Sequence, residues 1–386
     1  MTGSKLHNSK QISVLHVASG DLWAGAEVQL FTLAKELEKS ADVSVSVILL
    51  QHGTLECKLK DNGINVHVID ETIFSAPQIL KRLARKVKEL NPDIVHTHRS
   101  KENILGSIAA FVTDRKSSLR TTHGAVENPP RNLFHLRKIL IYLIDRFCGL
   151  FLQKRIIAVS HDLATILARY YPRSKISVIE NGIDFEELLR QTQPASTPMA
   201  TNHNIYHVCF AGRLVRIKRV DLIIRTARLI IDNHPDLQII FHIFGDGPLL
   251  EELKILSESL KTDRIVVFEG HHSIIADKLL NMDTLLITSD HEGLPMIALE
   301  AMALGVPIIS HSTGGITKLL ENGNCGLLVN EQEPLAYAAA LNQLASSPHK
   351  RAILSARALE RLKENYSSTR NAQKYITIYK ELADHA

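Results

Sequence analysis

Residues 284–295 read Thr-Leu-Leu-Ile-Thr-Ser-Asp-His-Glu-Gly-Leu-Pro, a strand pattern that runs into a polar turn. The apolar run 284–288 is typical of a buried strand. Pro295 suits the first position of a helix, where its missing N–H leaves no hydrogen bond unmade. A strand that passes through a turn into a helix is the repeating unit of an α/β protein with a parallel sheet.

Short apolar segments alternate with amphipathic segments along the whole chain, as expected for βαβ units. We predict strands at 12–18, 43–50, 64–69, 93–97, 118–122, 156–159, 176–179, 205–211, 238–244, 264–268, 284–288 and 306–310. We predict helices at 26–39, 77–90, 220–232, 248–260 and 334–346. The predicted fold is α/β with two doubly wound domains, whose ligands are expected where the strand carboxyl ends of both domains face a central cleft.

The domain boundary is predicted from composition. Residues 190–204 are polar and proline-rich and show no helical or strand periodicity of apolar residues, so we interpret them as a linker. The linker separates an N-terminal domain at 1–189 from a C-terminal domain that begins at 205.

Composition is that of an ordinary globular protein, with 386 residues, 45% hydrophobic and 22% charged. The four cysteines form no CxxC pair and no metal spacing, which favours a reducing compartment. No apolar run is long enough to span a bilayer, and the N-terminus has no signal-peptide pattern. We therefore expect a cytoplasmic protein.

Charge is distributed unevenly. Residues 1–190 hold 26 Lys and Arg against 20 Asp and Glu, and the remainder holds 19 against 21. A basic first half favours an anionic partner, either a phosphate-bearing acceptor or a membrane surface. Within it, residues 129–155 carry six Lys and Arg and one Asp among Phe, Leu and Ile. This segment is either an interfacial helix that binds an anionic membrane or a core helix with a charged rim.

Glu292 and Glu300 lie eight positions apart on the two sides of an apolar stretch. If most of that stretch is helical, they are separated by roughly 12 Å and point to one side. The exposed N–H groups of the helix start between them would bind phosphate. The alternative is a pair of solvated surface glutamates.

Other glycine-bearing turns follow strands. The loop 19–27 contains Gly25 and opens a helix, but it is not GxGxxG, which argues against a dinucleotide-binding dehydrogenase. Arg213 and Lys218 follow the strand 205–211 across a tight loop and could both reach one diphosphate, unless they form only a basic surface turn. Gly245 and Asp246 lie in a strand-to-helix turn that could cradle part of a nucleotide.

Histidines also lie at strand ends. His123 could hydrogen-bond a sugar hydroxyl, although a lone histidine is more often structural. The pairs His96/His98 and His271/His272 lack a third ligand at a recognisable spacing, so we predict no metal site.

Taken together, these motifs resemble the retaining glycosyltransferases of family 4, which have the GT-B fold of two Rossmann-like domains. The resemblance covers about residues 12 to 366. Its most specific parts are Gly212-Arg213-Leu214 with Lys218, Gly245-Asp246-Gly247-Pro248, Glu292-Gly293 through Glu300-Ala301, Gly305-Val306-Pro307 and Gly314-Gly315. Residues 178–184 match the segment at the domain junction.

The resemblance implies an N-terminal acceptor-binding domain, a nucleotide-sugar-binding domain at 205–366, and a C-terminal helix at 367–386 that crosses back. It implies that Gly25, Arg213 and Lys218 contact the diphosphate and that His123 contacts the donor sugar. Glu292 would hold sugar hydroxyls in a pocket lined by Gly293, Leu294, Pro295 and Met296, and Glu300 would bind the ribose.

The resemblance also implies that the sugar is transferred with retention of configuration, and that neither a metal nor a cofactor is needed. Where the family commonly has two adjacent glycines, this chain has Ala24 and Gly25, which bears on how closely that loop approaches a phosphate.

Three functions remain open at this point. The first is transfer from a UDP- or GDP-sugar to a glycan or lipid-linked acceptor in cell-surface polysaccharide, lipopolysaccharide or glycolipid biosynthesis. The enzyme would then be cytoplasmic or peripheral on the inner face of the membrane. The second is a soluble transferase with a sugar-phosphate or polyol acceptor. The third is a non-catalytic nucleotide-sugar-binding protein. No nucleic-acid partner is expected.

Overall fold

A computed structural model describes residues 11–21, 23–115, 117–124, 136–192, 205–272 and 275–384. The chain forms two compact units, Met1–Glu180 with Ser368–Ala386, and Asn181–Ser367. The boundary lies before the helix α7 (Phe185–Gln191), whereas the sequence placed it at 189. The backbone explains the difference, because the N–H of Ile183 donates to the carbonyl of Tyr366, 2.8 Å away, and ties this stretch to the second unit. Residues 193–204 of the predicted linker lie outside the described residues.

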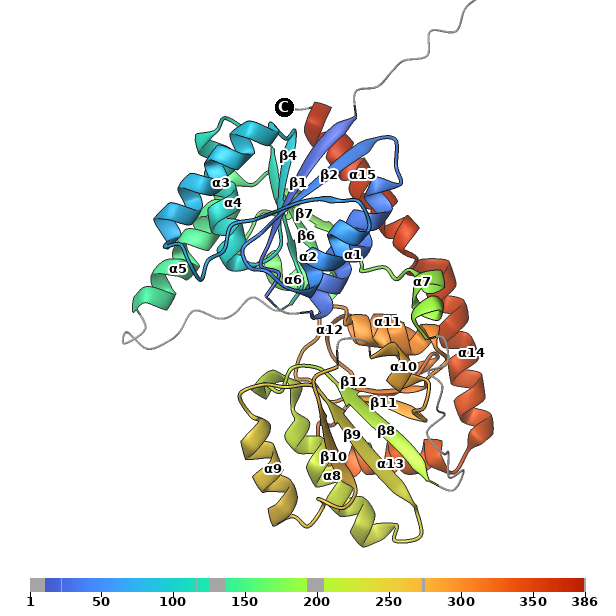
Figure 1. Ribbon diagram of the computed structural model, residues 1–386. Helices are drawn as coiled ribbons and strands as arrows, with labels where there is room; N and C mark the ends of the chain where they lie inside the picture. Colours follow the sequence, from blue (N-terminus) through green and yellow to red (C-terminus); the bar gives the residue numbers. More distant parts are fainter. Residues whose placement is uncertain are drawn as a thin grey trace, which may run out of the picture. The chain divides into compact units, whose positions relative to one another are not determined.

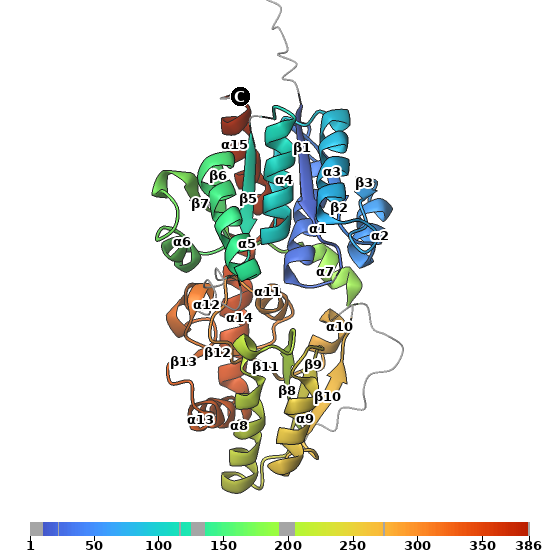
Figure 2. The ribbon, with the colours of Figure 1, turned by 90° about the vertical axis from the view of Figure 1, so that its left-hand side faces the viewer.

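The first unit is built on a seven-stranded parallel sheet. Its strand order is β3 (Asn65–Val68), β2 (Val43–Leu49), β1 (Ile12–Ala18), β4 (Ile94–Thr97), β5 (Ser118–Thr122), β6 (Arg155–Ala158) and β7 (Ile176–Val178). Helices α1 (Gly25–Glu38), α2 (Thr54–Asp61) and α15 (Ser368–Asp384) share one hydrophobic core with the sheet. Helices α3 (Ala76–Leu90) and α4 (Ser100–Val112) share another, which contains alternate residues of β1 and β2. Helices therefore cover both faces of this sheet (Figures 1 and 2).

Smaller elements complete the first unit after β5. They are α5 (Leu136–Phe147), the π-helix η2 (Cys148–Leu152), α6 (His161–Leu167) and the 3₁₀-helix η3 (Arg173–Lys175). In the part of the chain that the structure describes, no helix is long and apolar enough to cross a bilayer.

The second unit repeats the architecture with six parallel strands. Their order is β10 (Val266–Gly270), β9 (Ile239–Phe244), β8 (Tyr206–Ala211), β11 (Thr284–Ile287), β12 (Ile308–His311) and β13 (Leu327–Val329). Its helices, besides α7, are α8 (Val220–Asn233), α9 (Leu250–Ser259), α10 (Ala276–Leu279), α11 (Met296–Ala303), α12 (Gly314–Leu319), α13 (Pro334–Ala345) and α14 (Pro348–Asn365). Two 3₁₀-helices, η4 (Arg216–Lys218) and η5 (Glu321–Gly323), lie in its loops.

The predicted doubly wound α/β class is confirmed, and every predicted strand is present within two residues of its predicted ends. The strand β13 was missed. It has only three residues, too few for an alternation or an apolar run to be recognised.

Each sheet has one point where the strand order reverses. In the first unit this point lies between β1 and β4, and in the second between β8 and β11. In open α/β sheets, ligands bind outside the carboxyl ends of the strands at such a point. The loops that follow these four strands are therefore where a site is expected.

Candidate active site

The loops after β8 and β11 meet at the reversal point of the second sheet. The first loop contains Arg213 and Lys218, and the second contains Glu292. Their backbones are joined, because the N–H of Asp290 donates to the carbonyl of Ile217, 2.8 Å away. The Thr288 hydroxyl also donates to the carbonyl of Lys218, 2.9 Å away. Topology thus brings together residues that are more than 70 positions apart in sequence.

Lys218 and Glu292 form an ion pair. The ammonium Nζ lies 2.5 Å from Oε1 of the carboxylate, and both side chains are largely buried. The Ser289 hydroxyl donates to the same oxygen, 2.6 Å away. Two donors on one carboxylate oxygen fix its position. Glu292 is therefore held in place before any ligand arrives, with its second oxygen left for other donors.

Arg213 differs from Lys218 in its surroundings. It is exposed, and among the described residues no side chain binds its guanidinium. Arg216 of the same loop is likewise exposed and has no acidic partner among the described residues, so the loop carries positive charge that no carboxylate compensates. The arrangement suits an anionic ligand that contacts both Arg213 and Lys218.

Two glycines let backbone segments approach this loop pair. A Cβ on Gly245, whose φ is +138°, would lie 1.9 Å from the carbonyl oxygen of Gly212. A Cβ on Gly314, whose φ is +54°, would lie 1.9 Å from the carbonyl oxygen of Glu292. Both positions therefore require glycine for space as well as for conformation. Asp246, beside Gly245, is exposed, and its carboxylate accepts a hydrogen bond from the N–H of Gly247.

The helix that the sequence predicts to begin at Pro295 begins one residue later. Helix α11 begins at Met296, and Pro295 precedes it with ψ of 131° instead of occupying its first turn. Residues 292–295 are not helical, so only 296–300 of the stretch between the two glutamates have helical geometry. Asn181 holds the turn that precedes the helix, because its side-chain amide donates to the carbonyl of Leu294, 2.8 Å away. This contact between distant segments could not be read from local sequence.

The start of α11 remains suited to an anion or to polar groups. No side chain caps it, so its first N–H groups keep their hydrogen-bonding capacity. Gly293, Leu294 and Met296 around this turn are buried, and Pro295 is partly buried. The residues that follow Glu292 in the chain are therefore largely removed from solvent.

Glu300, on α11, is desolvated. Its Oε2 atom is buried and has no hydrogen-bond partner among the described residues. Burial raises the pKa of this carboxyl to about 7. A buried acceptor without a donor is expected to bind hydroxyl groups of a ligand, because those hydrogen bonds would restore its lost solvation.

In the first unit, Gly25 is the first residue of α1. The preceding Ala24 is extended, and no side chain caps the helix. Glu27, in the first turn, is buried and paired with Arg99, and burial raises the pKa of its carboxyl against the effect of that arginine. Gly25 is exposed at this uncapped helix start, close in sequence to the ion pair of Glu27 and Arg99.

His123 follows β5 and lies beside other histidines. Its Nε2 is 3.3 Å from Nδ1 of His98. Burial lowers the pKa of His123 to about 4, and the nearby Arg99 acts in the same direction. The ring is therefore neutral at physiological pH. Gly25 and His123 belong to the first unit, whereas the other predicted site residues belong to the second.

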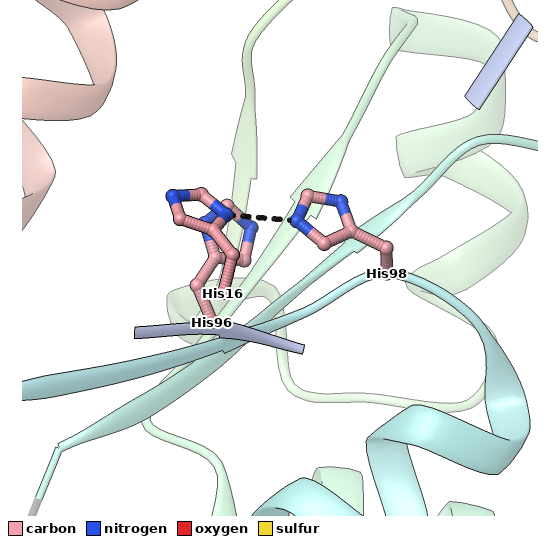
Figure 3. A group of neighbouring side chains, drawn as sticks. All are labelled: His16, His96 and His98. Atoms are coloured by element: carbon pink, nitrogen blue, oxygen red, sulfur yellow. Dashed lines mark hydrogen bonds between the residues drawn. The ribbon is translucent and has the colours of Figure 1, made fainter. Parts of the chain in front are cut away.

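His16, His96 and His98 come within metal-binding distance of one another (Figure 3). One nitrogen from each ring lies within 4.8 Å of the others. However, His96 already uses both nitrogens, at 2.8 Å from the Tyr379 hydroxyl and 2.8 Å from the Thr121 hydroxyl. The site is buried and has no carboxylate among its three side chains, so a divalent ion would be left with its charge uncompensated. Hydrogen bonding between neutral rings explains this cluster better than a metal.

Comparison with known proteins agrees with this geometry. Residues 193–361 match the family described as glycosyl transferases group 1, and residues 23–187 match glycosyltransferase family 4. The solved structure of Anabaena HepE in complex with UDP and glucose superposes with a TM-score of 0.82 at 19% identity, over 96% of this chain and 100% of that one. Two Rossmann-like units of this kind define the GT-B class of glycosyltransferases. The chain belongs to the glycosyltransferases that these two models describe, family 4 in its N-terminal half and group 1 in its C-terminal half.

Two bacterial relatives match most of the chain. The Escherichia coli UDP-Gal:alpha-D-GlcNAc-diphosphoundecaprenol alpha-1,3-galactosyltransferase is 25% identical over 340 residues, 82% of this chain and 86% of that protein. The Staphylococcus aureus capsular polysaccharide biosynthesis glycosyltransferase CapM is 25% identical over 329 residues, 81% of this chain and 84% of that protein. The predicted family and the GT-B fold are thereby confirmed.

Proposed function

We propose that this glycosyltransferase moves a sugar from a UDP- or GDP-sugar to a glycan or lipid-linked acceptor, with retention of anomeric configuration. The observation that carries the proposal is the Arg213 and Lys218 loop beside Glu292 at the reversal point of the second sheet. The names of the two relatives support it, since one specifies UDP-Gal with a diphosphoundecaprenol-linked sugar and the other capsular polysaccharide.

The proposed chemistry follows from the charges of the site. Breaking the bond between the sugar carbon and the diphosphate leaves negative charge on the leaving oxygen. Arg213 and Lys218 would stabilise that charge, and the acceptor hydroxyl would attack from the same face and pass its proton to the leaving phosphate. Glu292, with one oxygen fixed by Lys218 and Ser289, would hold the donor sugar by its hydroxyls, and Glu300 would accept from the ribose. The remaining residues of the proposed donor site are Gly25, His123, Gly245, Asp246, Gly293, Leu294, Pro295 and Met296.

A metal is not required by this proposal. Two cationic side chains can neutralise the charge that a divalent ion neutralises in other diphosphate chemistry. We therefore propose metal-independent transfer.

A transfer assay tests the proposal. The enzyme would be incubated with UDP- and GDP-sugars, and with a lipid-diphosphate-linked sugar, a sugar phosphate or a polyol as acceptor. We expect turnover with one lipid-linked or glycan acceptor, an NMR spectrum of the product that shows the donor's anomeric configuration, and an unchanged rate in EDTA. An inverted product would overturn the mechanism, and turnover only with a small acceptor would overturn the acceptor class. Binding without transfer or donor hydrolysis would favour a non-catalytic protein.

We further propose that the enzyme binds an anionic membrane surface through helix α5. None of its residues is buried, although half-buried Asp145 anchors it to Arg120 through an ion pair of 2.9 Å. Its apolar residues at helical spacing form one outward stripe, with exposed fractions between 53% and 68%, comprising Leu136, Leu140, Leu143 and Phe147. A folded protein rarely leaves such a stripe uncovered.

Charge selects the partner of this stripe. Arg137 and Lys138 are exposed at its N-terminal end, and Phe151 extends the apolar surface into η2. Apolar residues flanked by basic ones match the boundary between acyl chains and anionic headgroups. Arg131, a further basic residue of the predicted segment, lies outside the described residues.

Vesicle sedimentation tests the membrane proposal. Replacing Leu140 and Leu143 with serine, or Arg137 and Lys138 with alanine, is expected to reduce binding to phosphatidylglycerol vesicles about tenfold. The control replaces half-exposed Lys254, which pairs with Glu251, and exposed Ile255 of α9 with alanine and serine, and should bind normally. Equal binding of wild type and α5 variants would contradict the proposal, as would wild-type binding to phosphatidylcholine alone.

A further inference from the structure

Four histidines form a column in the first unit, at and beyond the carboxyl ends of β1, β4 and β5. His16 and His96 are register partners on β1 and β4, His98 follows β4, and His123 follows β5. The rings stack, with centroids 5.3 Å apart for His16 and His98 and 5.6 Å apart for His98 and His123. The inner three are buried, and the column ends at the partly buried His123.

Three of the rings are joined head to tail by hydrogen bonds. Nδ1 of His16 lies 3.0 Å from Nε2 of His98, the contact drawn in Figure 3. Nδ1 of His98 in turn lies 3.3 Å from Nε2 of His123. His96 is stacked on His98 at 4.5 Å, but its own hydrogen bonds go to Tyr379 and Thr121. His96 therefore packs against the chain of hydrogen bonds without belonging to it.

All four rings are neutral. Burial lowers the pKa of His16 to about 3 and the pKa of His123 to about 4, and it holds the pKa values of His96 and His98 well below the ordinary range. Each neutral ring carries one N–H, and each contact in the chain needs one proton. The three protons must therefore all point the same way, either toward His123 or toward His16.

The buried end of the chain decides the direction. Nε2 of His16 is buried and has no hydrogen-bond partner among the described residues. If the protons pointed toward His16, that nitrogen would be a buried N–H without an acceptor, and such orphan donors are rare. If the protons point toward His123, Nε2 of His16 carries no proton and has only a lone pair that accepts no hydrogen bond. The second arrangement puts the proton of His123 on Nδ1, the nitrogen that the chain does not use.

We propose that His16 and His98 are positioning residues that fix His123 as a neutral hydrogen-bond donor, with Nδ1–H directed to an oxygen of the bound sugar substrate. This inference rests on the proposed function for the identity of the ligand. It adds that the ligand atom is an acceptor, a hydroxyl or phosphate oxygen. It also explains why two buried histidines lie behind a site residue.

Two substitutions of His98 separate its two contacts. In His98→Asn the side-chain amide lies near the place of Nδ1 and can still donate to His123. In His98→Gln the amide reaches the place of Nε2, so the contact with His16 is kept and the contact with His123 is lost. The two variants are similar in polarity, and their thermal unfolding would be compared to confirm that both fold.

The tautomer is read by NMR, independently of activity. Long-range ¹H–¹⁵N correlation of protein labelled with ¹⁵N-histidine should place the proton of His123 on Nδ1 in wild type and in His98→Asn. In His98→Gln it should shift toward Nε2, the form that free imidazole side chains prefer. The turnover number of His98→Gln should fall about tenfold with little change in donor KM, and His98→Asn should retain most activity.

Each other outcome counts against the inference. A proton on Nε2 of His123 in wild type would overturn it, as would identical spectra and rates for the two variants. Stoichiometric metal in the purified protein, lost in His16→Ala, would replace it with a metal site at His16, His96 and His98. If wild type transfers no sugar, the proposed function fails, but the NMR result still decides whether the chain of hydrogen bonds exists.

Discussion

Replacing both Arg213 and Lys218 with alanine is expected to weaken nucleotide diphosphate binding by at least about a hundredfold. Each charge-assisted hydrogen bond to a phosphate contributes about 1.5–3 kcal/mol, so losing two removes roughly 3–6 kcal/mol. Lys218 should have the larger single effect, because its removal also leaves the carboxylate of Glu292 without its partner at 2.5 Å. That carboxylate would then repel the diphosphate.

Calorimetric titration with UDP, GDP and ADP measures this effect and identifies the base. Arg216 supplies the matched control, since it is an exposed arginine of the same loop. Arg216→Ala should bind the nucleotide with nearly wild-type affinity. Unchanged affinity in the double variant would show that the diphosphate does not bind at this loop. The main support for the proposed donor site would then be lost.

Replacing Gly314 with alanine is expected to lower both stability and donor affinity strongly. The new Cβ would lie 1.9 Å from the carbonyl oxygen of Glu292, so one of the two segments must move. The positive φ of +54° adds about 1–2 kcal/mol of conformational strain. We expect a total destabilisation above about 3 kcal/mol, because backbone cannot yield as a flexible side chain does.

Gly305 separates the steric effect from the conformational one. Its φ of +70° is similarly unfavourable for alanine, but a Cβ there meets nothing within 4 Å. Gly305→Ala should therefore lose only the conformational part, about 1–2 kcal/mol, and keep its donor KM. Thermal unfolding and donor KM would be measured for both variants. Equal losses in the two would show that the approach of Gly314 to Glu292 does not shape the site.

The local pattern was sufficient for the parallel α/β architecture. Strands such as β1 and β8 are buried on both faces, so they appear as continuous apolar runs bounded by polar turns, and their ends were predicted within two residues. The pattern failed at β13, which is too short, and it placed the start of the helix after β11 at Pro295, one residue before α11 begins. The turn before this helix agrees with local sequence, since a residue that precedes proline favours extended backbone, but its contact with Asn181 could not be predicted from local sequence.

The sequence also supplied the residue types of the site, because a diphosphate requires cationic side chains and close backbone approach, and these appear as Arg, Lys and Gly in short loops. Which residues meet was decided by tertiary structure alone. The pairing of Lys218 with Glu292 depends on β8 and β11 being neighbours in the sheet, although β9 and β10 lie between them in the sequence. The histidine column depends in the same way on the order β1, β4, β5. Strand order is set by burial of whole helices and strands against one another, a global property, whereas residue type and local period are written in the sequence itself.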